Sequence, residues 1–135
     1  MVIDSSALVA IFLREPERQF YLNLVVKDRA RRVSAVSFVE TGMVLEGRRG
    51  PAAQDELERF LERLAIEVVA VDRGQANSAL AAWRKYGKGR HPAGLNLGDC
   101  FSYALAKSAG EPLLAKGEDF ARTDLKLCPQ APPTQ

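Results

Sequence analysis

Histidine and cysteine are scarce in this sequence, and their scarcity limits the kinds of site it can build. His91 is the only histidine, and Cys100 and Cys128 are the only cysteines among 135 residues. A zinc site or a histidine-based nucleophilic triad has little to build from, and metal-independent RNA cleavage by a histidine pair is excluded. The two cysteines lack metal-ligand spacing. We expect both as reduced thiols, because a domain of this size needs no disulfide.

Long apolar runs are also missing. No stretch approaches the roughly 18 uninterrupted apolar residues of a membrane helix, and Asp4 breaks an apolar opening that carries no basic leader. We therefore expect no membrane partner, and a cytoplasmic location as the default. Neither a repeat nor a long linker divides the chain. One domain is expected over residues 1–128, followed by a disordered tail over residues 129–135.

Short apolar runs typical of strands alternate with segments of helical periodicity. The strand-like runs cover residues 2–3, 33–36, 66–71 and 113–115. Helices are expected over or around residues 5–13, 16–27, 37–47, 57–64, 76–83 and 97–105. Strands separated by helices of this length predict an α/β fold with a short, mostly parallel sheet flanked by helices in three layers.

Acidic residues lie where these strands end or where the following helices begin. Asp4 follows the first strand, Glu40 lies near the start of the helix after the second, and Asp99 opens the last helix. Glu118 and Asp119 follow the last strand. Because ligands bind beyond the carboxyl ends of parallel strands, we expect these acids to gather there. Clustered carboxylates require a hard divalent cation, or protonation of several members.

Two details refine this set of acids. Asp119 is preferred to Glu118 as the fourth member, because Phe120 beside it can anchor the segment in the core. Glu118 remains a rival. Ser6 follows Asp4 by two residues, and its hydroxyl can either cap the helix or orient the Asp4 carboxylate.

Each acid also has a purely structural explanation. Asp4 suits an N-cap, Ser37 and Glu40 have the spacing of a capping box, and Asp99 stands where an N3 acid would cap its helix. Adjacent acids after a turn usually lie in a solvated loop. The location shared by four separate segments, rather than any single residue, therefore favours a metal site for phosphodiester cleavage.

The basic residues point to a polyanionic partner or to a solvated surface, and charge alone favours neither. If four of the 17 acids share a pocket, 13 remain to face 19 lysines and arginines, an excess of six positive charges. The candidates for holding an RNA backbone around the site are Arg48, Arg49, Lys88, Arg90 and Lys116. His91 is expected to be an exposed loop residue rather than a catalyst.

Three segments resemble the PIN-domain ribonucleases, and within them the toxin subunits of bacterial VapBC toxin–antitoxin pairs. They are VIDSSALVAIFLREPE, VSAVSFVETGMVL and LNLGDCFSYALAKSAGEPLLAKGEDFARTDL. The resemblance spans about residues 1–127. It implies that Asp4, Glu40, Asp99 and either Asp119 or Glu118 are the catalytic, metal-binding acids, with Ser6 behind Asp4.

The same resemblance implies an activity and a set of partners. It implies RNA cleavage that depends on Mg²⁺ or Mn²⁺, homodimerisation, and inhibition by a cognate VapB-like antitoxin in a hetero-oligomer. The antitoxin's C-terminal segment would cross the site, often placing an arginine among the acids.

Two other functions compete with this prediction. A PIN-like domain can serve as a non-catalytic binding scaffold, although a scaffold needs no pocket of like charges. A flavodoxin-like receiver, which accepts a phosphoryl group, needs an isolated acceptor aspartate after its third strand. Asp72 at that place reads as a helix cap, so this alternative ranks low.

Overall fold

The structure, a computed structural model, describes residues 1–133 and consists of one parallel sheet enclosed by helices. The strands are β1 (Val2–Ile3), β2 (Arg32–Ser34), β3 (Glu67–Val69) and β4 (Leu113–Leu114). The helices are α1 (Ser5–Phe12), α2 (Arg18–Lys27), α3 (Ala35–Arg49), α4 (Ala52–Arg63), α5 (Arg73–Tyr86) and α6 (Leu97–Ala109), and a 3-10 helix, η1 (Asp119–Arg122), follows β4. The predicted α/β class is confirmed, with every strand pair parallel.

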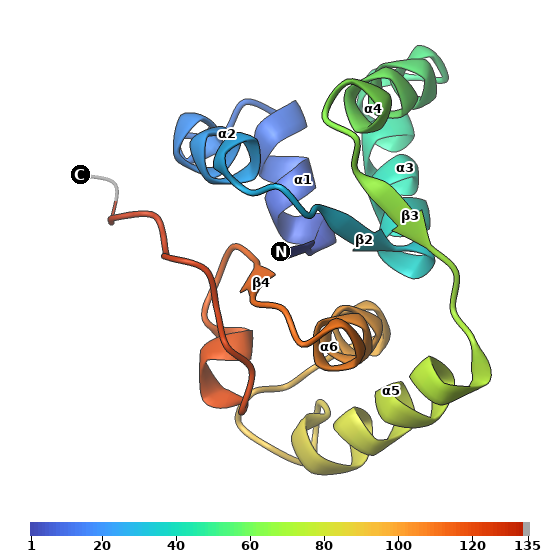
Figure 1. Ribbon diagram of the computed structural model, residues 1–135, viewed down its shortest axis with the longest axis vertical. Helices are drawn as coiled ribbons and strands as arrows, with labels where there is room; N and C mark the ends of the chain where they lie inside the picture. The colour runs from blue at the N-terminus through green and yellow to red at the C-terminus, as the bar shows by residue number, and fades with distance from the viewer. Residues whose placement is uncertain (134–135) are drawn as a thin grey trace.

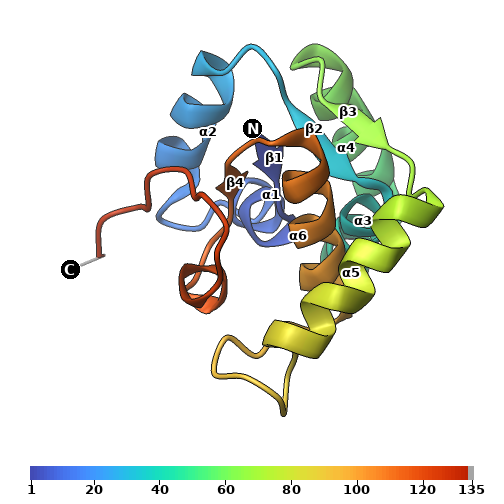
Figure 2. The ribbon, with the colours of Figure 1, turned by 60° about the horizontal axis from the view of Figure 1, so that its bottom comes forward.

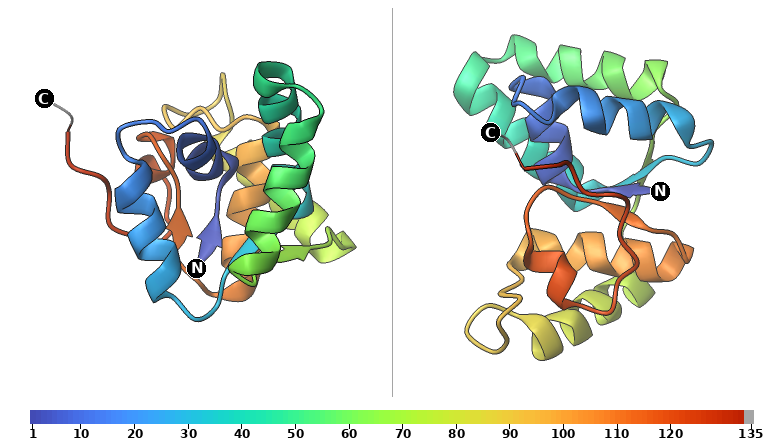
Figure 3. Two further views of the ribbon diagram at one scale, coloured as in Figure 1. Left: turned by 90° about the horizontal axis from the view of Figure 1, so that it is seen from above. Right: turned by 90° about the vertical axis from the view of Figure 1, so that its left-hand side faces the viewer.

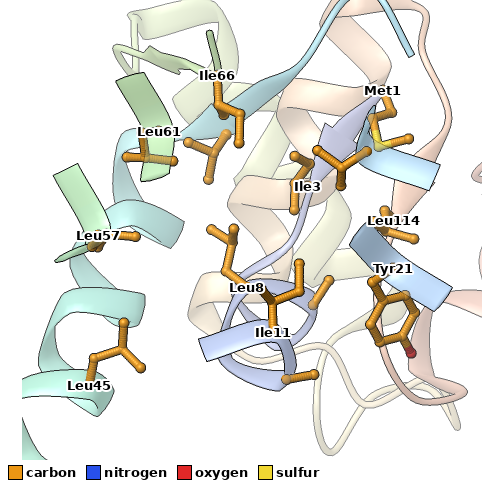
Figure 4. Close-up of a cluster of buried hydrophobic side chains, with 14 of the residues drawn as sticks. Met1, Ile3, Leu8, Ile11, Tyr21, Leu45, Leu57, Leu61, Ile66 and Leu114 are labelled. Carbon is orange, nitrogen blue, oxygen red and sulfur yellow. The ribbon is translucent and has the colours of Figure 1, made fainter. Parts of the chain in front are cut away.

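The helices cover the two faces of the sheet unequally. Helices α1 to α4 lie on one side, and α5, α6 and η1 lie on the other, with the strands between them (Figures 1 and 3). Each side has its own cluster of buried side chains. The cluster under α1 to α4 includes Leu8, Leu57 and Tyr21 (Figure 4). The three predicted layers are therefore present, and burial on both faces explains why β1 and β4 are wholly apolar.

The order of the strands puts the first strand between the second and the last. The sheet runs β3-β2-β1-β4, and Val2 pairs with Arg32 on one side and Leu113 on the other. The chain leaves β1 toward β2 and returns to β4 on the opposite side, so a topological switch point lies between β1 and β4. In open α/β sheets, ligands bind at the carboxyl ends of the strands at such a point.

The start of α3 differs from the prediction. The helix begins at Ala35 with Ser34 as its N-cap, and the Ser34 hydroxyl accepts the Val36 N–H. The predicted capping box of Ser37 and Glu40 is therefore wrong, and Glu40 lies in the second turn. Ser37 is completely buried and bonds to Ser102 on α6 instead, because its side chain faces the neighbouring helix rather than the helix end.

The two cysteines and the C-terminal tail were also the subject of predictions. Cys100 and Cys128 are free and buried in different core clusters. In the tail, the Gln130 side chain donates to the Cys128 carbonyl, and Ala131 packs on the first core cluster. Residues 134 and 135 lie outside the described part, and tail disorder stays a prediction. No helix within residues 1–133 is both long and apolar enough to cross a membrane.

Candidate functional site

Asp4 lies at the carboxyl end of β1 with its carboxylate held on both sides. It is 2% exposed. Its Oδ2 accepts the backbone N–H of Ser6 at 3.0 Å and the Ser6 hydroxyl at 2.6 Å, which makes Asp4 the N-cap of α1. Its Oδ1 accepts the Ser102 hydroxyl at 2.5 Å. Asp4 is therefore both a helix cap and a fixed carboxylate at the sheet edge.

Ser6 joins this carboxylate to the last strand. Its Oγ, which donates to Asp4, also accepts the backbone N–H of Lys116 at 3.0 Å. Lys116 follows β4 and precedes the turn that carries Glu118 and Asp119. The hydroxyl predicted to orient Asp4 thus also holds the segment of the fourth acid beside the first.

Glu40 reaches from α3 to the first turn of α6. A Cβ added to Gly98 would overlap the Glu40 carboxylate. Because Gly98 has no side chain, the Glu40 carboxylate can lie beside the first turn of α6, next to Asp99. The Ser5 hydroxyl donates a weak hydrogen bond to Glu40 Oε1 at 3.5 Å. Burial and the nearby charge of Asp4 raise the pKa of Glu40, and the Ser5 contact opposes them.

Asp99 is the most strongly perturbed of the acids. It forms a full capping box with Asn96: each side chain accepts the other residue's backbone N–H, at 2.9 and 3.1 Å. Burial raises the pKa of Asp99 to about 7, the Asn96 N–H opposes this, and the charges of Asp4, Asp119 and Glu40 add to it. Asp4, Glu40 and Asp119 therefore all lie within electrostatic reach of Asp99.

The two candidates for the fourth acid face different surroundings. Asp119 begins η1, and its negative charge contributes to the raised pKa of Asp99. The predicted anchor beside it is present, because Phe120 is buried in the second core cluster. Glu118 lines a cavity of about 570 Å³ together with Tyr21 and other residues. This arrangement favours Asp119.

The acids fit a hydrated divalent cation rather than a tight cage. Within residues 1–133, no three histidine, cysteine, aspartate or glutamate side chains stand close enough together to enclose an ion directly. Carboxylate oxygens are nevertheless the ligands that Mg²⁺ and Mn²⁺ prefer, and Mg²⁺ usually keeps several of its waters. The Glu40 carboxylate fills the space beside Gly98 and therefore lies close to Asp99, the next residue in the chain.

Three of the five candidate RNA-backbone cations are already paired. Lys116 forms ion pairs with two acids, Glu15 and Glu17. Arg49 donates to the Phe12 carbonyl and pairs with Glu56 at 3.3 Å. Arg90 lies over the Trp83 ring and donates to the Arg84 carbonyl. The structure thus engages these side chains in contacts within the protein itself.

The other two cations, Arg48 and Lys88, are exposed. Arg48 lies in the last turn of α3, about 12 Å along the helix axis from Glu40 at 1.5 Å per residue. Lys88 lies in the loop between α5 and α6, which projects from the body of the molecule (Figure 2). In that loop, His91 stacks edge-on against Tyr86 and its Nδ1 accepts the Ala93 N–H, which gives His91 a structural role.

Sequence reasoning missed three residues of the site. Ser102 donates a hydrogen bond to Asp4, Ser37 bonds to Ser102 in turn, and Gly98 accommodates Glu40. A faint signal exists for Ser102, because it is a polar residue among Cys100, Tyr103 and Ala104, all of which are buried. Nothing local marks Ser37 or Gly98, since their partners come from another helix.

Comparison with known proteins identifies the family of this chain. A family model described as PIN domain matches residues 1–126. The chain belongs to the PIN domain family. Among its relatives, Ribonuclease VapC30 of Mycobacterium tuberculosis is 53% identical over 125 residues, which cover 93% of this chain and 95% of that protein. Ribonuclease VapC of Mycolicibacterium smegmatis is also 53% identical, over 93% of this chain and 97% of its own.

Solved structures of PIN-domain toxins share the fold. VapC20 of Mycobacterium tuberculosis, a toxin that cleaves the sarcin–ricin loop, superposes with a TM-score of 0.74 at 18% identity, over 92% of this chain and 95% of its own. VapBC2 of Rickettsia felis, bound to a DNA fragment of its promoter, gives 0.75 at 14% identity, over 97% and 98%. At such identities the likeness supports the PIN-type α/β fold alone.

Proposed function

We propose that this protein is an endoribonuclease of the VapC type, the toxin of a toxin–antitoxin pair, which hydrolyses RNA in the cytoplasm with Mg²⁺ or Mn²⁺. Ribonuclease relatives at 53% identity support the activity. The observation that carries the metal requirement is Asp99, whose pKa is raised to about 7 by burial and by three other acids. Such a group of carboxylates needs compensating positive charge to ionise together.

The proposed ligands are Asp4, Glu40, Asp99 and Asp119. When bound, the cation would polarise the scissile phosphate and acidify a coordinated water. The protein holds these carboxylate oxygens after the ends of β1 and β4 and at the contact between α3 and α6. An acid of this cluster would serve as general base toward the attacking water.

The test is RNA cleavage with and without a divalent cation. The purified chain should cleave RNA with Mn²⁺ or Mg²⁺ and stop when EDTA is added. Asp4→Asn and Asp99→Asn should fold, lose cleavage and relieve growth arrest on expression. Cleavage that survives EDTA, or normal cleavage by either variant, would contradict the proposal.

We also propose a VapB-like antitoxin as the partner. Solved structures with this fold include toxin–antitoxin complexes from Klebsiella pneumoniae and Salmonella typhimurium. A cluster of acids with raised pKa values offers a basic side chain, such as an arginine of the antitoxin, a favourable ion pair. Co-expression with the product of a neighbouring gene should yield a stable complex without nuclease activity. An active complex would contradict this mode of inhibition.

A homodimer belongs to the same proposal. A groove of about 530 Å³ between α5 and α6 is lined by apolar residues that include Leu80, Trp83 and Leu97. Leu97 is 75% exposed, so this surface offers apolar area to a second copy. Light scattering should give twice the chain mass, and Leu80→Asp with Leu97→Asp should yield monomers if this groove is the interface.

One observation favours the alternative of a non-catalytic scaffold, namely that no three of the described acids directly enclose an ion. The two functions differ in their response to metal. A nuclease site should give saturable thermal stabilisation by Mn²⁺ that Asp99→Asn abolishes. A scaffold should show neither the stabilisation nor the cleavage.

A further inference from the structure

Two buried serines from different helices meet behind Asp4. Ser102 of α6 and Ser37 of α3 are both 0% exposed. Ser102 Oγ lies 2.5 Å from Asp4 Oδ1, and Ser37 Oγ lies 2.9 Å from Ser102 Oγ. The three residues form a hydrogen-bonded row that runs from the interface of α3 and α6 to the carboxylate at the end of β1.

The chemistry of these groups fixes the direction of every hydrogen bond in the row. As a metal ligand Asp4 is a carboxylate, which accepts hydrogen bonds and donates none. Ser102 must therefore donate its single hydroxyl proton to Asp4 Oδ1. Its bond with Ser37 can then form only if Ser37 donates and Ser102 accepts. Ser37 thus keeps the Ser102 proton turned toward Asp4.

Counting the hydrogen bonds that Asp4 accepts identifies its free lone pair. A carboxylate has about four acceptor positions, two on each oxygen. Both positions of Oδ2 are taken by the N–H and hydroxyl of Ser6. One position of Oδ1 is taken by Ser102. The remaining acceptor position therefore lies on Oδ1, the oxygen that Ser102 holds.

We propose that Ser102, locked by Ser37, is a positioning residue that presents Oδ1 of Asp4 as its one metal-binding oxygen. This inference rests on the proposed function, because it assigns a task to residues behind a proposed ligand. Neither serine touches substrate or metal, and Asp4 would bind the cation through a single oxygen. Partners of this kind orient metal-binding carboxylates, and their loss typically weakens metal affinity by about 10- to 100-fold.

A purely structural role would leave a different signature. If the two hydroxyls served only to satisfy each other, replacing both by alanine would be nearly neutral, because no unpaired buried polar group would remain between them. Replacing Ser102 alone would leave the Ser37 hydroxyl without its acceptor and Asp4 without a donor. The double variant therefore separates packing from positioning.

The experiment measures Mn²⁺ affinity by calorimetry and the melting temperature of the metal-free chain, for wild type and four variants. These are Ser102→Ala, Ser37→Ala, the double variant, and Ser108→Ala as an exposed control on the same helix. We expect Ser102→Ala and the double variant to bind Mn²⁺ about 10-fold more weakly and Ser37→Ala to show a smaller loss. Ser108→Ala should bind like wild type. The double variant should melt higher than Ser102→Ala without regaining affinity.

Two results would overturn the inference in distinguishable ways. If wild type binds Mn²⁺ and cleaves RNA while Ser102→Ala and the double variant bind equally well, Ser102 has no positioning role and the nuclease function stands. If affinity returns together with stability in the double variant, the serines are structural only. If wild type binds no Mn²⁺ and cleaves in EDTA, the proposed metal function fails, and the positioning role fails with it.

Discussion

The Glu40 carboxylate occupies the space that a side chain at position 98 would fill. A Cβ on Gly98 would overlap the carboxylate oxygens, so Glu40 and Gly98 pack as an acid against a bare backbone. The overlap involves the far end of a flexible side chain, which can move aside at little expense in stability. A substitution at position 98 should therefore separate activity from folding.

We predict that Gly98→Ala keeps or slightly raises stability but loses most nuclease activity. Alanine favours the helix by up to about 1 kcal/mol over glycine, while displacement of Glu40 by an ångström or more can reduce the rate by about 100-fold. Thermal melting and RNA cleavage measure the two effects. Gly47→Ala, on the exposed side of α3 with open space around it, should leave cleavage unchanged. A fully active Gly98→Ala enzyme would show that the position of Glu40 does not matter.

A second prediction concerns pH. The pKa of Asp99 is raised from 3.8 to about 7 in the folded chain, so between these values the folded state binds more protons than the unfolded state. Stability of the metal-free chain therefore falls as pH rises through this window. From pH 5 to pH 8, the melting temperature of wild type should therefore fall relative to that of Asp99→Asn. A constant difference would mean that Asp99 titrates normally.

Divalent cations should reverse this trend. Metal binding requires deprotonated carboxylates, so Mn²⁺ affinity should rise with pH up to about 7 and then level off. Calorimetry across pH 5.5 to 8 would measure it. Affinity that is flat over this range would contradict the participation of Asp99.

The fourth acid can be assigned by a pair of variants. We expect Asp119→Asn to weaken Mn²⁺ binding and RNA cleavage by about 10-fold or more, because its charge acts on Asp99. Glu118→Gln should leave both near wild type. The opposite ranking would assign the role to Glu118 and its neighbouring cavity.

The basic residues lead to a prediction about RNA binding. Lys88 and Arg48 are exposed, whereas Arg90 is engaged with Trp83. In an inactive Asp99→Asn background, Lys88→Ala and Arg48→Ala should weaken RNA binding and each lower the salt-dependence slope by about 0.7, the value for one phosphate contact with a single strand. Arg90→Ala should have a smaller effect. Unchanged slopes in both would place the RNA elsewhere.

The sequence predicted what is set locally or by topology. The strands were visible as short apolar runs, and Asp99 as a helix cap, because both depend on near neighbours. The common edge of the acids followed from the parallel arrangement, in which the carboxyl ends of the strands lie together. That one rule linked Asp4 to Asp119 across 115 positions.

Contacts between distant segments were not predictable in the same way. Ser37 and Ser102 meet across 65 residues, and Gly98 matters only because α3 passes close to it. The predicted capping box at Ser37 was wrong for the same reason. Its sequence spacing fits a capping box, but the Ser37 side chain is buried against another helix instead of capping its own. The ion pairs of Arg49 and Lys116 likewise depend on partners from other elements.

The placement of β4 beside β1 bears on when the four acids can come together during synthesis. The strand β4 that pairs with β1, and the segment that carries Asp119, are translated more than a hundred residues after Asp4. A nascent chain therefore cannot assemble the four acids while most of it is still being synthesised. A ribonuclease arranged in this way gains its candidate site only after the segment that follows β4 has left the ribosome.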